Sequence, residues 1–332
     1  MMSNSSTPEI AVIIPFYQRE TGLLTQCVRS ILEQPGGVDC QIIVVDDESP
    51  IPADQELARF LPDAGDRLRI IHQPNAGPGA ARNTGLDNVP PGTPYVTFLD
   101  SDDQWTGPFL SDAVAALEQG YDLFMGNSTR VGSETSRFEW DKNPVLNIHP
   151  ADHKTIDPER ALYEYQGDFF DLLIRRSNII GPTTMAYRFD RFAAVRFDPT
   201  IYNGQDRLFK LTLGQDFQRV AFSPKLYAYE GEGINIFDKS QWGTAGSIRL
   251  LSSYIRLSRR ILATIRLNPE QRAYVRHQLA DSRRSFALSI PHLLKKGVSI
   301  DWRRVMATFR EDPLCAMLFL PNLARGFLAK RH

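Results

Sequence analysis

The sequence has few of the features that mark secreted or membrane-spanning proteins. Its three cysteines, Cys27, Cys40 and Cys315, match no metal-binding spacing and no disulfide framework, so we expect buried, reduced thiols. The N-terminal residues MMSNSSTPEI lack the basic and apolar segments of a signal peptide. No run of about 18 apolar residues predicts a transmembrane helix. These absences together predict a cytoplasmic protein.

Net charge is also nearly absent, at −1 over 332 residues, but the charges are unevenly distributed. From Gly246 onward the chain holds 17 Lys and Arg against 5 Asp and Glu, whereas the first 245 residues hold 21 against 34. The length accommodates one large domain and an appendage. We therefore expect two regions with different partners and place their boundary near Ser240.

Short apolar runs alternate with segments of helical periodicity along the first half of the chain. Strands are predicted at 10–14, 41–45, 68–72, 95–99 and 121–127, and helices at 22–34, 53–61, 80–88 and 109–119. This alternation predicts an α/β fold with a mostly parallel central sheet flanked by helices.

The second half of the chain gives a different pattern. A loop is predicted over 130–160, helices over 157–174 and 205–213, and a strand over 185–189. From Thr244 the helical pattern continues to the C-terminus, with breaks at 268–269, Pro291, Gly297 and Pro313.

The predicted strand at 95–99 ends in three carboxylates, Asp100, Asp102 and Asp103. Like charges this close stay ionised only near positive charge, which a divalent cation with oxygen ligands would supply. A solvated acidic turn that caps the next helix is the alternative. Asp46 and Asp47 end another strand and could join the same site, because parallel sheets bind ligands at the carboxyl ends of their strands. A helix N-cap and a turn are their alternative roles.

Residues 75–85, NAGPGAARNTG, place glycines before a predicted helix. Backbone N–H groups there could approach an anion, and the forked donors of Arg82 could reach a phosphate. The dinucleotide-binding fingerprint is absent, since position 82 is Arg instead of Gly. Asp206 opens the helix predicted at 205–213, where a cap or dipole partner is the ordinary role.

Five segments occur in an order and spacing that resemble the family 2 glycosyltransferases, which have the GT-A fold. They are the strand ending in Pro15, Phe16 and Tyr17, VVDDES at 44–49, NAGPGAARNTG at 75–85, FLDSDD at 98–103 and GQDRLF at 204–209. The resemblance covers roughly residues 9–235, and residues 10–105 are similar to the bacterial exopolysaccharide branch of succinoglycan-type glucosyltransferases. It implies a GT-A catalytic domain over 1–240 and a basic, amphipathic helical C-terminal region over 241–332.

The resemblance also implies a nucleotide-binding role for several positions. Pro15 and Tyr17 would lie at the uracil ring of a UDP-sugar, and Asp47 would hydrogen-bond the base. Arg82 would lie near the nucleotide or the donor sugar.

The family's D-x-D motif matches Asp100, Ser101 and Asp102. The resemblance places Asp100 and Ser101 at the ribose, Asp102 on Mg²⁺ or Mn²⁺, and Asp103 beside it as a second metal ligand. No histidine lies between His153 and His277 to act as the later metal ligand found in some GT-A enzymes.

Asp206 matches the family's catalytic base, with Gln205 in place of the usual Glu. Cleavage of the C1–O bond leaves negative charge on the diphosphate, which a divalent ion and Arg82 would neutralise. A carboxylate would take the proton of the acceptor hydroxyl. Attack opposite the leaving group inverts the anomeric centre, so an α-linked UDP-sugar would give a β-linkage on an oligosaccharide acceptor. The finer resemblance implies glucose as the donor sugar, with galactose and rhamnose as the alternatives.

The C-terminal region has basic amphipathic segments at 248–265 and 302–309. These could lie on the anionic inner face of the plasma membrane, where the resemblance places polyprenyl-linked acceptors. Alternatively, their apolar stripes pack on the catalytic domain. No nucleic-acid partner is expected, because aromatic residues are sparse among the arginines.

Two other functions are compatible with parts of the sequence. Phosphotransfer enzymes of the haloacid-dehalogenase type also carry D-x-D after a strand, but they expect Thr or Val where this chain has Gln104. A non-catalytic sugar-nucleotide binder or assembly subunit of the same fold is the second alternative. The intact Asp206 and the carboxylate cluster argue against it.

Overall fold

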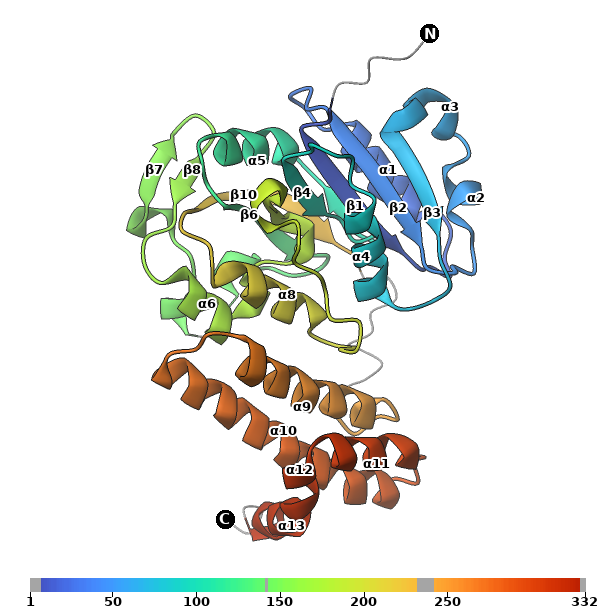
Figure 1. The fold of residues 1–332 in the computed structure, drawn as a ribbon, viewed down its shortest axis with the longest axis vertical. Helices are drawn as coiled ribbons and strands as arrows, with labels where there is room; N and C mark the ends of the chain where they lie inside the picture. Colours follow the sequence, from blue (N-terminus) through green and yellow to red (C-terminus); the bar gives the residue numbers. More distant parts are fainter. Residues whose placement is uncertain (1–6, 141–142, 232–241, 329–332) are drawn as a thin grey trace. The chain divides into compact units, whose positions relative to one another are not determined.

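The computed structural model describes residues 7–140, 143–231 and 242–328 (Figure 1). The chain forms two compact units, one of Met1–Pro199 with Phe209–Ile234 and one of Thr200–Leu208 with Asn235–His332. Each unit has its own cluster of buried apolar residues. The boundary expected near Ser240 falls outside the described residues.

The first unit is built on one mixed sheet with the strand order β3-β2-β1-β4-β9-β6-β10-β8-β7, and β5 pairs with β10. The strands are β1 Ile10–Phe16, β2 Cys40–Asp46, β3 Leu68–His72, β4 Tyr95–Phe98, β5 Gln104–Trp105, β6 Leu123–Arg130, β7 Lys154–Asp157, β8 Leu162–Glu164, β9 Met185–Arg188 and β10 Val220–Glu230. Only β5, β8 and β9 run against the others among these strands. The predicted α/β fold with a mostly parallel sheet is therefore confirmed.

Helices flank this sheet. They are α1 Leu23–Leu32, α2 Ala53–Leu57, α3 Leu61–Ala64, α4 Pro78–Asp87, α5 Phe109–Glu118, α6 Phe169–Arg175, α7 Phe189–Phe192 and α8 Gln205–Gly214. Helix α8 begins in the segment that belongs to the second unit and continues into the first.

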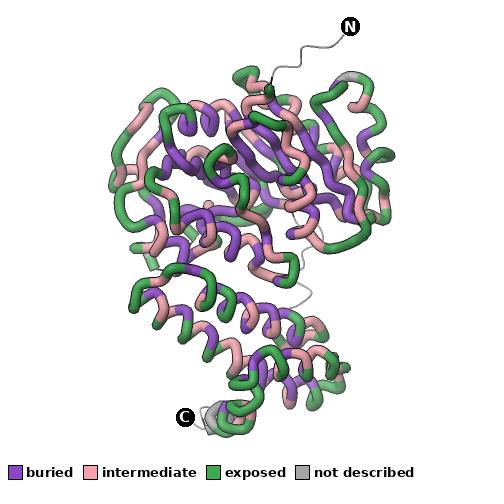
Figure 2. Tube along the Cα trace, in the orientation of Figure 1, coloured by how far each residue is buried: buried purple, intermediate pink, exposed green. Residues whose placement is uncertain are grey.

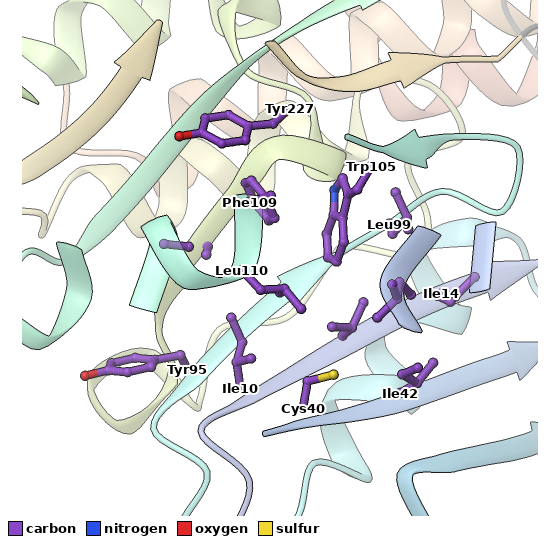
Figure 3. Packing of buried hydrophobic residues seen from close by; sticks show 14 of the residues in the cluster. Ile10, Ile14, Cys40, Ile42, Tyr95, Leu99, Trp105, Phe109, Leu110 and Tyr227 are labelled. Atoms are coloured by element: carbon purple, nitrogen blue, oxygen red, sulfur yellow. The ribbon is translucent and has the colours of Figure 1, made fainter. Parts of the chain in front are cut away.

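Strand β1 is central, because it pairs in parallel with β2 and β4. It is buried along its whole length (Figure 2), as expected for a strand covered on both faces, and this explains its unbroken apolar sequence. Ile10 and Ile14 belong to a core that also contains Phe109 of α5 (Figure 3). Helix α4 lies so close to β1 that a Cβ on Gly85 would be 2.3 Å from Ile13 Cγ2.

The helix predicted over 157–174 is wrong. Asp157 Oδ1 accepts hydrogen bonds from the N–H groups of Glu159 and Arg160, which form a turn in place of a helical start. The φ values of Ala161 (50°) and Gly167 (113°) are positive and therefore interrupt a right-handed helix. The segment instead forms β8 and the short α6.

Strand β10 was not predicted, although it pairs with β6, β8 and β5. Pro224 and Lys225 interrupt its apolar pattern, and the pairing with β6 slips between Ser223 and Leu226. The helix predicted over 53–61 is divided into α2 and α3.

The C-terminal helices of the second unit are α9 Ser247–Thr264, α10 Pro269–Lys295, α11 Trp302–Glu311, α12 Pro313–Met317 and α13 Phe319–Leu328. Asn268 and Gln271 form a capping box at the start of α10. Pro291 lies inside α10 and does not break it, contrary to the prediction, and its neighbours Ile290 and Leu293 are buried in the core of this unit.

All three cysteines are buried and unpaired. Within the ranges that the structure describes, every helix is too short or too polar to cross a bilayer.

Candidate active site

Three loops meet at the carboxyl edge of the parallel strands β2, β1 and β4. Gln18, which follows β1, joins them: its backbone N–H donates to Ser49 Oγ at 3.0 Å, and its side-chain amide donates to Ser101 Oγ at 3.2 Å. Gln18 is buried, and sequence reasoning missed it, because a glutamine after a strand carries no recognisable signal.

The Asp100–Asp103 segment forms a tight turn after β4, in which Asp103 N–H donates to the carbonyl of Asp100 at 2.9 Å. The carboxylate of Asp103 is buried and accepts hydrogen bonds from the hydroxyl of Thr183 and, at 3.0 Å, from the N–H of Gly231. A Cβ on Gly231 would lie 2.1 Å from the carbonyl oxygen of Asp102. The turn is thus held between Thr183 and the residue that follows β10.

The turn carries more negative charge than its surroundings neutralise. Burial and the neighbouring charge of Asp100 raise the pKa of Asp102 to about 6. Burial, followed by the charges of Asp100 and Asp102, also raises the pKa of Asp103. No other residue in the described part of the chain donates a hydrogen bond to the carboxylate of Asp102 or forms an ion pair with it. A cation beside this carboxylate would therefore stabilise it.

A hard divalent cation suits these oxygen donors. In the described part of the chain, no group of three or more His, Cys, Asp or Glu side chains is arranged to hold a metal. Mg²⁺ is commonly bound by one or two carboxylates together with substrate phosphates and water. The residues present therefore fit a metal that is completed by a bound diphosphate.

Arg82 of α4 is the cation next to this turn. Its Nη2 donates to Asp100 Oδ1 at 2.5 Å, and its guanidinium lies 5.4 Å from the centre of the Phe197 ring. Arg82 is buried, and its Nε has no hydrogen-bond partner among the described residues. The side chain is consequently held between Asp100 and Phe197.

Asp47 lies against the glycine-rich segment. Its carboxylate accepts from the side-chain amide of Gln73 at 2.6 Å and from the N–H groups of Ala76 and Gly77 at 2.9 and 2.8 Å. These two N–H groups, which we predicted could approach an anionic ligand, are bound to the protein's own carboxylate. The interaction fixes the loop that begins α4.

Asp46 has the alternative structural role, that of capping a helix. Its two carboxylate oxygens accept from Ser49 N–H at 2.7 Å and Ala53 N–H at 2.8 Å, which caps α2. Strand β1 lies between β2 and β4, so Asp46 does not join the Asp100–Asp103 turn.

The remaining predicted site residues are placed as follows. Pro15 is buried within β1 and pairs with Val45, and Tyr17 follows β1 with its side chain partly exposed. Asp206 lies in the first turn of α8, in the segment Thr200–Leu208 of the second unit. Its role as the catalytic base stays a prediction.

The sequence profile described as Glycosyl transferase family 2 matches residues 11–195, more than half of the chain. The chain belongs to glycosyl transferase family 2. The phosphotransfer alternative is thereby overturned.

Among the relatives of this family 2 glycosyltransferase is the succinoglycan biosynthesis protein ExoW of Rhizobium meliloti (strain 1021). It is 33% identical over 230 residues, which cover 69% of this chain and 70% of ExoW.

Solved structures with the same fold include S. aureus TarS 1–349 in complex with UDP-GlcNAc, with 18% identity and a TM-score of 0.52 over 86% of this chain and 73% of TarS. The mannosyltransferase PcManGT of Pyrobaculum calidifontis, in complex with GDP-Man and Mn²⁺, has 15% identity and a TM-score of 0.53 over 96% of this chain and 85% of PcManGT. At these identities the likeness shows the fold alone, a GT-A glycosyltransferase fold.

An ion pair between the buried Glu230, at the end of β10, and Arg137 supports the site of this glycosyltransferase. Glu230 accepts hydrogen bonds from Ser128 Oγ at 2.7 Å and from two nitrogens of Arg137. Because Glu230 immediately precedes Gly231, the pair fixes the backbone that touches Asp102 and Asp103. Sequence reasoning missed it because β10 itself was not predicted.

Proposed function

We propose that this family 2 glycosyltransferase is an inverting, metal-dependent hexosyltransferase. It moves glucose from a UDP-sugar to a polyprenyl-linked oligosaccharide in bacterial exopolysaccharide synthesis and forms a β-linkage. The name of its relative ExoW supports the pathway, and the UDP-GlcNAc complex of TarS supports a UDP-sugar donor for this fold.

The observation that carries the proposal is the buried carboxylate turn beside Arg82. Asp100 is already paired with Arg82, and Ser101 is joined to the β1 loop through Gln18. Asp100 and Ser101 are therefore preorganised to meet the ribose, and the guanidinium of Arg82 places a positive charge beside them that could face the diphosphate. Pro15, Tyr17 and Asp47 are proposed to surround the uracil.

Asp102 and Asp103 are proposed to hold Mg²⁺ or Mn²⁺, and the Mn²⁺ complex of PcManGT supports this choice for the fold. Asp102 is the better placed of the two, because the oxygens of Asp103 already accept from Thr183 and Gly231. When bound, the ion would neutralise charge that develops on the departing diphosphate.

Asp206 is proposed to take the proton from the acceptor hydroxyl during attack at C1, with Gln205 in the place of the family's usual Glu. General-base catalysis of this kind contributes about 10²–10⁴-fold. Attack on the face opposite the diphosphate inverts the anomeric centre, which gives the β-linkage from an α-linked donor.

Residues 1–240 are proposed to carry this chemistry, and residues 241–332 to bring the enzyme to the inner face of the plasma membrane. The second unit combines its excess of Arg and Lys with exposed apolar side chains, among them Trp302, Met306, Leu314, Met317 and Leu320. Such a combination favours an anionic lipid surface, where a polyprenyl-linked acceptor resides.

The first test is UDP release from UDP-glucose by the purified protein with Mn²⁺ and an oligosaccharide acceptor. Asp102→Asn should lose Mn²⁺-dependent UDP binding and turnover together. Asp66→Asn, an exposed carboxylate in the same unit, should keep both and controls for the loss of one charge. Unchanged turnover in Asp102→Asn would remove the carboxylate turn from the mechanism.

The second test separates a transferase from a non-catalytic binder of the same fold. Asp206→Asn should bind UDP like the wild type in calorimetry but lose transfer by at least about 100-fold. A fully active variant would exclude Asp206 as the base. Wild-type protein that binds UDP-sugars but never releases UDP would support the non-catalytic alternative.

A further inference from the structure

The second unit contains a basic cavity between α9 and α11 that the transferase reaction does not use. Its volume is about 360 Å³. Its lining includes Arg249, Arg256, Arg303 and Arg304 on the two helices, and Tyr202 from the segment before α8.

Two of these cations have no carboxylate partner among the described residues: Arg249 and Arg303. Both are exposed. The guanidinium of Arg249 stacks on Tyr202, 3.3 Å from the ring centre, which leaves its edge free to donate hydrogen bonds. A guanidinium held by its face on an aromatic ring is preorganised to bind a phosphate with two N–H groups.

The acidic groups of this region are already neutralised. Asp301 caps α11 and pairs with Arg304, and both oxygens of Glu311 accept from Arg256. The cavity therefore keeps a net positive charge, although Asp301 forms part of its wall.

The basic surface extends along α9. A second cavity of about 520 Å³ shares Ser252, Arg256 and Thr308 with the first and adds Arg259 and Arg260. Asp312, which also lines it, is held by Arg283 through two hydrogen bonds of 2.7 Å. The two cavities form one groove, which we call the α9–α11 groove.

Exposed apolar side chains lie on α11, one of the two helices that line the groove. Trp302 and Met306 are 53% and 50% exposed and are one turn apart on this helix. Phosphate ligands free in solution need no apolar rim, whereas a lipid headgroup brings acyl chains beside its phosphate.

We propose that the α9–α11 groove binds the phosphate of an anionic lipid headgroup, with Arg249 and Arg303 as its principal ligands. This inference rests on the membrane contact proposed above and names its chemistry. It depends on neither the donor sugar nor the identity of the catalytic base.

The test compares two full-length double variants that lose the same charge. Arg249→Gln/Arg303→Gln removes the groove cations, and Arg276→Gln/Arg284→Gln removes two exposed arginines of α10 that line neither cavity. Sedimentation with phosphatidylcholine vesicles, with and without phosphatidylglycerol, measures binding. The groove variant should bind anionic vesicles at least about tenfold more weakly, and the α10 variant should lose less than about twofold.

Equal losses of vesicle binding in the two variants would show that binding depends on the overall positive charge of the second unit and not on the groove. That result would overturn the proposal. A third variant, Arg249→Lys/Arg303→Lys, keeps the charge but loses the forked donors and the stacking on Tyr202, so it should bind anionic vesicles several-fold more weakly than the wild type. It keeps the test valid if the Gln variant does not fold.

A thermal-shift titration with inorganic pyrophosphate distinguishes the source of the phosphate. Stabilisation by pyrophosphate without binding to anionic vesicles would overturn the lipid source. UDP release from UDP-glucose without acceptor, assayed in parallel, should be unchanged in the groove variant. If the wild type binds anionic vesicles but releases no UDP from UDP-glucose, the transferase proposal is contradicted. The proposal that the α9–α11 groove binds lipid would then still hold.

Discussion

At the scale of single residues, the site depends on how each carboxylate is hydrogen-bonded. Asp46, Asp47 and Asp103 all accept hydrogen bonds from the surrounding protein, whereas the carboxylate of Asp102 has no such donor among the described residues. Four similar side chains at strand ends thus acquire different roles from their local partners. Asp102 is therefore the carboxylate of the four that we propose as the main metal ligand.

Thr183 and Thr184 offer a matched pair for testing the support of the turn. Thr183→Val removes the hydroxyl that donates to the buried carboxylate of Asp103 and should lower the free energy of unfolding by about 1–3 kcal/mol. Thr184 Oγ1 is buried without a hydrogen-bond partner in the described ranges, so Thr184→Val should cost almost nothing. Urea unfolding measures both, and equal losses would contradict the assigned role of Thr183.

Gly231 tests the close backbone contact with Asp102. An alanine Cβ would lie 2.1 Å from the carbonyl oxygen of Asp102, so Gly231→Ala must displace the carboxylate turn. A displacement of about 1 Å can cost about 100-fold in turnover. We expect loss of Mn²⁺-dependent UDP binding, measured by calorimetry. Gly37→Ala, which meets no atom within 4 Å, should cost stability through its φ of 66° but leave UDP binding intact.

At the scale of secondary-structure elements, the pair of Glu230 and Arg137 joins β10 to the short 3₁₀ helix Arg137–Glu139. Burial by itself would raise the pKa of Glu230, but the hydrogen bonds and charge of Arg137 more than offset it, so the pKa lies below its ordinary value. Such a carboxyl contributes stability above its unfolded pKa and loses that contribution as the pH falls through its folded pKa.

The lowered pKa of Glu230 predicts how the stability of the Glu230→Gln variant, relative to the wild type, changes with pH. Near neutral pH the variant should be less stable than the wild type by about 1.5–3 kcal/mol, because a charged hydrogen bond is lost. The difference should shrink as the pH falls below the ordinary Glu pKa of about 4.3 and through the lower pKa of folded Glu230, where the wild-type carboxylate becomes protonated. Urea unfolding at several pH values measures it. A difference that does not change with pH would mean that Glu230 is not ionised in the folded protein.

At the scale of the whole molecule, the chain has two compact units with separate apolar cores. The chain contributes Thr200–Leu208 to the second unit, with Asn203 N–H donating to Ser253 Oγ of α9 at 2.9 Å. The segment that contains Asp206 therefore packs with the C-terminal helices. The proposed base and the proposed carboxylate turn belong to different units.

Substitutions in each core test whether the units unfold independently. Phe286→Ala empties a fully buried site in the second unit and should cost about 3–5 kcal/mol. Hydrogen exchange should rise in α9–α11 and stay unchanged in β1, β2 and β4. Phe124→Ala in the first unit should have the reverse effect. Exchange that rises in both units for either variant would show that they unfold as one.

Much of the first unit was predictable, because its strands are short apolar runs separated by helical periods. Strands β1, β2, β3 and β4 and helices α1, α4 and α5 occur within a few residues of their predicted positions. Strand β10, and the turn and strand β8 that replace most of the helix predicted over 157–174, were not predictable in this way. In β10 a register slip and Pro224 interrupt the apolar pattern, and at 157–160 the hydrogen bonds of the Asp157 side chain form a turn instead of a helix. The effect of these features depends on pairing with distant strands.

The sequence by itself determined the family and the α/β architecture, and it identified the residues at the strand ends, because periodicity and motif order are local properties of the chain. Only the tertiary structure decided how these residues divide their roles. Asp47 binds the loop before α4, Thr183 and Gly231 hold Asp103, and the side chain of Asp102 receives no hydrogen bond from another described residue. These partners lie up to 128 residues apart, and hydrogen bonding at that separation depends on packing instead of sequence pattern.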